Sequence, residues 1–417
     1  MNTMNGDNEV GLIVIGAPQK ESDNGLTRMT SVITVRGDAR PVWFEVEEKY
    51  GQYLCAERSD AFLIGILNYA MREHCDIRCE SPVGAQLLYQ IRTYLIPSLV
   101  RHSKVLYAAN IDAEMDSNPI ANAGGVGAGV SCGVDSLHVI KNYAKSPYPS
   151  LSLTHLVLNN VGAFWRGAED RQYEWQTAHV RKFCKENGFE LILTNSNIAE
   201  QIPQNHLLTH TYSSCFAVYC LQKLWNVYYY GSPGYDFAQY FSLADNEKYD
   251  SAHYELLSLD VFSTRNLKIY SEGGAIDRFE KVKDLVGYEP SYKYLHVCTA
   301  DEGPNCGHCG KCLRTLTTLD ALGVLDKYRE SFDVEDYKRN RRNRLKWLYV
   351  QQIDVHGDKM TQAAYQILSN QISLSLKVSA WCSFYARRIL SYAKTLTIKA
   401  LPGLYKLYRK YYRHYAD

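Results

Sequence analysis

The sequence predicts an α/β protein with a parallel, doubly wound sheet at its centre, an α+β domain before it and a helical region after it. From residue 126 to residue 231, short apolar runs alternate with helical patterns, an order typical of a parallel sheet covered on both faces. Strand-like runs and two apolar helical patterns come before residue 114, and helical patterns dominate after residue 330. The length of 417 residues supports two or three domains.

Residues 1–120 are expected to form the α+β domain. Their short β-branched runs predict strands, and their longer apolar runs predict buried helices. The expected strands are 10–15, 31–36, 41–46 and 107–113, and the expected helices are 61–71 and 83–99. Residues 114–125 are polar and rich in Gly, Ala and Asn, so we expect a junction there.

Residues 121–325 are expected to form the central core, and residues 326–417 a helical region rich in basic and aromatic side chains. The expected core strands are 126–130, 154–158, 190–194 and 226–231. The expected core helices are 135–143, 171–187, 211–225 and 313–322.

Composition and charge indicate where the protein is found in the cell but do not indicate which kind of partner it binds. The formal net charge is +1, which indicates no particular class of partner. The N-terminus lacks a signal-peptide pattern, and no run of about 18 apolar residues predicts a membrane span. We therefore expect a cytoplasmic protein, in which the clustered members of the 12 cysteines act as metal ligands or catalysts rather than disulfides.

The turn after the first core strand is the main candidate site. A small-residue turn between a strand and a helix places backbone N–H groups and a positive helix end where phosphate binds. Serine hydroxyls add donors, and an aspartate there could hold Mg²⁺ or cap the helix. Neither a Walker pattern nor G-x-G-x-x-G is present, which disfavours a P-loop ATPase and a dinucleotide fold. The residues of the turn are Ser131, Cys132, Gly133, Val134, Asp135 and Ser136.

These six residues resemble the SGGxDS loop of the ATP pyrophosphatase (PP-loop) superfamily, which implies an adenine nucleotide alpha-hydrolase-like fold. The resemblance implies ATP with Mg²⁺ at the loop, Ser131, Asp135 and Ser136 in catalysis, and adenine near Asn159, Asn160 and Gly162 after the second core strand. The departure is Cys132, which stands at the family's first glycine and could restrict the loop or place a thiol beside the phosphates.

Four cysteines form the second candidate site. Their spacing, with glycines between them, predicts a closed tetrahedral zinc site with a structural role, and an iron–sulfur cluster is the alternative metal centre. They are Cys298, Cys306, Cys309 and Cys312. A PP-loop followed by this cluster resembles 7-cyano-7-deazaguanine synthase (QueC) over residues 124–322, which implies an enlarged QueC-like enzyme.

The resulting hypothesis is an ATP-dependent ligase or synthase that adenylates a carboxylate, releases pyrophosphate and transfers the acyl group to a nitrogen nucleophile. The carboxylate could belong to a small molecule such as a deazapurine, or to a protein terminus. Two alternatives are a PP-loop sulfur transferase that uses a thiol such as Cys132, and a non-catalytic nucleotide-binding scaffold. The protein could also form a homodimer.

Several further residues are weaker candidates. Ser232 and Asp236 follow the fourth core strand and could line the pocket. His210, Thr211 and Tyr212 are expected to begin a helix, where they could face the phosphates or, in the case of Thr211, cap the helix. Arg265 and Lys268 could bind pyrophosphate or a substrate carboxylate. Lys311 and Arg314 flank the cysteines. The basic, tyrosine-rich tail permits a membrane-surface helix, a nucleic-acid contact, or tyrosines packed on the protein body.

Overall fold

The computed structural model describes residues 10–163, 171–232, 251–298 and 303–400. The chain forms two compact units. The first unit comprises Met1–Cys306 with Tyr328–Phe332, and the second comprises Gly307–Lys327 with Asp333–Asp417.

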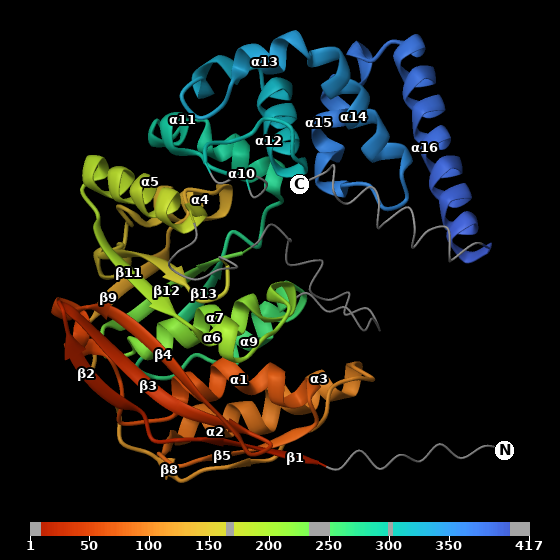
Figure 1. Ribbon diagram of the computed structural model, residues 1–417. Helices are drawn as coiled ribbons and strands as arrows, with labels where there is room; N and C mark the ends of the chain where they lie inside the picture. Colours follow the sequence, from red (N-terminus) through yellow and green to blue (C-terminus); the bar gives the residue numbers. More distant parts are fainter. Residues whose placement is uncertain (1–9, 164–170, 233–250, 299–302, 401–417) are drawn as a thin grey trace. The chain divides into compact units, whose positions relative to one another are not determined.

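An 11-stranded sheet runs through the first unit (Figure 1). Its order is β13-β12-β9-β10-β11-β4-β3-β1-β5-β7, and β2 pairs with β3. The strands are β1 (Gly11–Ile15), β2 (Gln19–Asp23), β3 (Leu26–Val35), β4 (Asp38–Glu47), β5 (Cys75–Cys79), β7 (Ile111–Asp112), β9 (Gly125–Gly129), β10 (His155–Asn160), β11 (Glu190–Ser196), β12 (Trp225–Gly231) and β13 (Lys268–Glu272). A separate two-stranded ladder joins β6 (Val83–Gly84) to β8 (Met115–Asp116).

The half of the sheet that follows residue 120 is parallel, as the sequence predicts. Strands β13, β12, β9, β10 and β11 all pair in parallel. The expected first domain joins this half through β4, which pairs antiparallel with β11. The described residues of the first unit on either side of residue 120 therefore share one sheet, and one hydrophobic cluster extends from Ile13 to Ile269. The compact units consequently divide the chain differently from the three domains expected from the sequence.

Helices cover both faces of the parallel half of this sheet, whereas the N-terminal strands have helices on one face (Figure 1). In the first unit they are α1 (Asp60–Arg72), α2 (Ala85–Gln90), α3 (Ile96–His102), α4 (Val134–Tyr143), α5 (Arg171–Asn187), α6 (Ile198–Gln201), α7 (His206–Cys220), α9 (Glu255–Val261), α10 (Arg278–Leu285) and α11 (Pro290–Tyr294). The expected single helix over residues 83–99 is instead α2 and α3 joined by a π-helical turn, Ile91–Leu95, with Pro97 in the first turn of α3.

The junction between the two halves of the sheet is packed with aromatic rings. Phe216 of α7 lies edge-on to Phe44 of β4 and to Phe62 of α1, with ring centroids 5.7 and 5.6 Å apart. Gly65 permits this contact, because a Cβ there would lie 2.7 Å from Ile198 and 3.2 Å from Phe216. Helices α1 and α7 can therefore approach closely at this glycine.

The second unit is helical, as expected. It contains α12 (Gly310–Ala321), α13 (Val334–Arg339), α14 (Arg341–Ile353), α15 (Gln362–Leu368) and α16 (Leu374–Ala400). Its core cluster consists of Leu345, Leu348, Leu368, Ile372 and Leu376.

Three aromatic side chains on the described part of α16 are exposed. Trp381, Tyr385 and Tyr392 are 51%, 39% and 68% exposed. These three rings are therefore largely open to solvent. The tyrosines beyond residue 400 lie outside the described residues.

Candidate functional site

The segment of residues 131–136 (the β9–α4 loop), which follows β9 and includes the first residues of α4, lies at the carboxyl edge of the parallel strands. Register pairs Val157 of β10 with Gly129, and Tyr229 of β12 with Ala128. The segments that follow β10 and β12 therefore leave the sheet at the same edge as the loop. Ligands bind at this edge in open α/β sheets.

Cys132 has the backbone conformation that favours glycine. Its φ is +55°, in the left-handed region that residues with a Cβ rarely adopt. Its side chain is fully buried, and burial raises the pKa of its thiol well above the usual value. Cys132 thus adopts a conformation that glycine adopts more readily, and its thiol lies in the protein interior.

Two segments hold the loop by its carbonyl groups. Gln176 of α5, which is buried, donates from Nε2 to the Ser131 carbonyl at 2.8 Å. The backbone N–H of His296 donates to the Cys132 carbonyl at 2.9 Å. Anchored carbonyls fix the peptide planes of the loop before any ligand binds.

The loop serines lie close together. Their hydroxyl oxygens are 3.4 Å apart, and the Ser131 hydroxyl accepts a hydrogen bond from the Gly133 N–H at 3.3 Å. Ser136 donates to the Gly133 carbonyl at 3.2 Å. Both hydroxyls are thus positioned at the start of α4.

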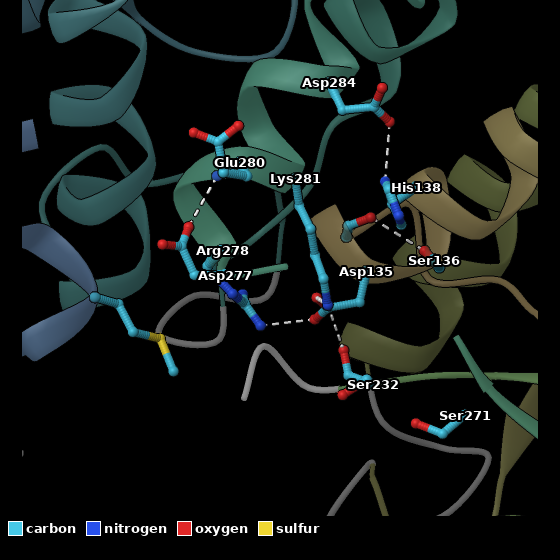
Figure 2. Close-up of polar contacts among 12 residues, drawn as sticks. Asp135, Ser136, His138, Ser232, Ser271, Asp277, Arg278, Glu280, Lys281 and Asp284 are labelled. Carbon is cyan, nitrogen blue, oxygen red and sulfur yellow. Dashed lines mark hydrogen bonds and ion pairs between the residues drawn. The ribbon is translucent and has the colours of Figure 1, made fainter. Parts of the chain in front are cut away.

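Asp135, in the first turn of α4, is the centre of an ion-pair cluster (Figure 2). Arg278 of α10 donates to its Oδ2 at 2.7 Å, and Lys281 donates to its Oδ1 at 3.0 Å. Lys281 has no exposed surface and also donates to the Ser232 carbonyl at 3.0 Å. The alternative that Asp135 caps the helix is wrong, because the N-cap is Gly133 and the carboxylate contacts α10 instead.

A second polar contact braces α4 against α10. His138 Nδ1 lies 2.9 Å from Asp284 Oδ2 (Figure 2). Lys141 pairs with the other carboxylate oxygen. Burial lowers the pKa of His138, and the Asp284 carboxylate opposes that shift. The brace keeps α10, and with it Arg278 and Lys281, beside the loop.

Arg278 and Lys281 were not singled out from the sequence. They lie 143 and 146 residues after Asp135, a distance that no local motif covers. The only signal nearby is Asp277, whose side chain caps α10 by accepting from the Glu280 N–H at 2.9 Å.

The residues expected near adenine lie at the end of β10. Asn159 accepts from the Thr194 hydroxyl at 2.9 Å, and Asn160, which is buried, donates to Asn195 at 2.8 Å. Gly162 has φ +113°, so its conformation requires glycine. The two asparagine side chains thus connect β10 to β11.

Two other candidates lie within α7 and β13. Thr211 is a buried residue within α7, whose N-cap is Asn205, so the expected helix start at 211 is wrong. Lys268 is the first residue of β13 and pairs with Asp260, so it lies at the amino end of a strand parallel to β12 and β9.

Arg265 precedes Lys268 and lines a cavity of about 550 Å³ together with Arg58 and Asp60. A five-residue strand separates this edge from the carboxyl edge by about 15 Å, so pyrophosphate binding by Arg265 or Lys268 at the loop is excluded. Arg314 pairs with Asp358 within the second unit, and Asp236 lies outside the described residues.

The four expected cysteines come together. All their Sγ atoms lie within 4.8 Å of one another. Zn–S bonds of about 2.3 Å in a tetrahedron place sulfurs about 3.8 Å apart, so this arrangement fits zinc. Gly307 has φ +73°, and Cys309 caps α12 by accepting from the Cys312 N–H. The sulfurs are Cys298, Cys306, Cys309 and Cys312.

The fold and the two clusters define an α/β protein with a helix-start loop at the carboxyl edge of a parallel sheet and a four-thiol group able to hold a metal. No protein-family model, curated protein or solved structure matches this chain. Among the described residues, no helix is both long enough and apolar enough to cross a membrane.

Proposed function

We propose that this protein is an ATP-dependent ligase or synthase of the PP-loop, QueC-like type, which adenylates a carboxylate and passes it to a nitrogen nucleophile. The observation that carries the proposal is the pair of cations, Arg278 and Lys281, held at the first turn of α4 beside the β9–α4 loop. A helix start with two cations beside it and serine hydroxyls within it suits a polyphosphate.

The proposed reaction has two steps. A carboxylate oxygen attacks the α-phosphorus of ATP, and pyrophosphate leaves to give an acyl-adenylate. The nitrogen nucleophile then attacks the acyl carbon, loses a proton and displaces AMP. The protein mainly positions two anions and neutralises their charge.

Each part of the loop has a proposed role. Ser131 and Ser136 donate to phosphate oxygens, and Arg278, which keeps some exposed surface, neutralises the leaving pyrophosphate. The buried Lys281 holds Asp135 in position. Asp135 is the proposed ligand of Mg²⁺, whose positive charge offsets the negative charge of the phosphates. The carboxyl end of β10, with Asn159, Asn160 and Gly162, is the proposed adenine side.

The position of Cys132 favours this proposal over sulfur transfer. A sulfur transferase needs a thiolate that the substrate reaches, and this thiol is buried with a raised pKa. Measurable ATP-dependent turnover would rule out the alternative of a non-catalytic nucleotide-binding scaffold.

The test is ATP–pyrophosphate exchange with the full chain against a panel of carboxylic acids that includes 7-carboxy-7-deazaguanine. We expect exchange with one acid, and release of AMP when an amine or ammonia is added. Ser136→Ala should reduce the rate at least about tenfold, since it removes a phosphate donor, whereas Ser22→Ala on β2 should not. Release of ADP, or ATP binding without turnover on any acid, would overturn the proposal.

A further inference from the structure

Helix α16 has two apolar faces, and one of them packs into the core of the second unit. Leu376 and Ala380 are buried, and Leu376 belongs to the core cluster that includes Leu345 and Leu348 of α14. Lys346 of α14 donates to Ser379 and Ser383 along this side at 3.1 and 2.8 Å. This face of α16 is therefore covered by α14 and the core of the second unit.

The other face is an exposed apolar stripe. Its residues recur every three or four positions, so they share one side of the helix, nearly opposite Leu376 and Ala380. The stripe consists of Leu374 (78% exposed), Val378 (54%), Trp381 (51%), Tyr385 (39%), Ile389 (68%) and Tyr392 (68%). At 1.5 Å per residue it is about 27 Å long.

The charges around the stripe all have one sign. Lys377 and Arg388 border it by helical position, and Arg387 follows on the same helix. The sequence contains no Asp or Glu between Asp358 and Asp417. Whatever covers the stripe therefore meets apolar groups, aromatic rings and positive charge together.

We propose that this stripe docks onto an anionic phospholipid surface, with α16 lying in the plane of the interface. Aliphatic side chains enter the acyl boundary, Trp and Tyr favour the headgroup level, and Lys and Arg attract anionic lipid. A second copy of α16 would instead bring like charges together without acidic partners to offset them. Nucleic acid would leave the aliphatic residues without a partner, because it binds such segments through stacking and charge.

The test is flotation of the full-length protein with vesicles of phosphatidylcholine, with or without phosphatidylserine. We expect binding to the anionic vesicles that weakens as salt is raised, and little binding to the neutral ones. Leu374→Gln combined with Ile389→Gln should weaken binding at least about tenfold, because it removes two aliphatic anchors. The matched control is Ile367→Gln, an apolar residue of α15 that is 49% exposed, and it should bind normally.

Trp381 provides a second readout. Spin-labelled lipid should quench the fluorescence of the bound protein less in Trp381→Phe than in the parent, because this indole reaches the interface. Vesicle binding that the double variant leaves unchanged, or equal binding to neutral vesicles, would overturn the proposal. So would a dimer or an oligonucleotide complex, formed in place of vesicle binding, that the double variant abolishes.

Discussion

The ammonium nitrogen of Lys281 lies 3.0 Å from Oδ1 of Asp135, and the lysine side chain has no exposed surface. The same nitrogen donates to the Ser232 carbonyl, and Arg278 occupies the other carboxylate oxygen. One fully buried cation thus connects α10 to the first turn of α4 and to the end of β12.

Lys281→Met is expected to lower the free energy of unfolding by about 2–4 kcal/mol, because it removes one partner of a buried ion pair and leaves the Ser232 carbonyl without its donor. Denaturation by urea measures this change. The control is Lys283→Met on the same helix, whose side chain is 57% exposed and pairs with Glu280 at 3.2 Å. It should change stability by less than about 0.5 kcal/mol.

The double variant Asp135→Asn with Lys281→Met tests the pairing itself. Its loss of stability should be smaller than the sum of the two single losses, since both remove the same interaction. Additive losses would mean that Lys281 acts through packing alone.

Gly65→Val should destabilise the protein by about 2–3 kcal/mol, because its side chain would overlap Ile198 and Phe216 between α1 and α7. Thermal or urea unfolding measures the loss. Gly287→Val is the comparison, since a Cβ there meets only the Asp284 carbonyl at 3.8 Å. Equal effects of the two substitutions would contradict close packing at Gly65.

The thiol of Cys132 should react slowly with iodoacetamide in the folded protein, whereas the exposed Cys382 should react first. Burial both blocks access to Cys132 and raises its pKa, so little thiolate forms there near neutral pH. Peptide mapping by mass spectrometry after timed labelling gives the two rates. Labelling in denaturant should remove the difference, and early labelling of Cys132 in the folded state would contradict its burial.

The purified protein should contain about one zinc ion per chain, held by the four clustered thiols. Cys309→Ala should reduce the zinc content and destabilise the protein, while Cys382→Ser, which changes an exposed cysteine outside the cluster, should retain the metal. Elemental analysis measures both. Iron with matching sulfide, in place of zinc, would support the iron–sulfur alternative.

Local patterns predicted much of this fold. The alternation from residue 126 onward corresponds to β9, α4, β10, α5, β11, α7 and β12, and the expected strand at 10–15 is β1. Strands with polar side chains escaped prediction: β5 reads Cys-Asp-Ile-Arg-Cys and β13 reads Lys-Ile-Tyr-Ser-Glu. Such short runs have no apolar stretch that marks them as strands.

The four cysteines could be grouped from sequence because their spacing is local. The contacts of Asp135 could not, since Arg278 and Lys281 arrive from a distant helix. The pairing of β4 with β11 could not be predicted from the sequence for the same reason, because 150 residues separate Glu45 from Asn195. Long-range partners depend on topology, which periodicity does not encode.

The pairing of β4 with β11 has a practical consequence for truncation. A chain begun at residue 121 would leave the N–H and C=O groups of β11 as an open sheet edge and uncover Phe216. Such a fragment should self-associate through that edge rather than fold as an autonomous domain. Activity measurements on this protein therefore require residues 10–120 to be present.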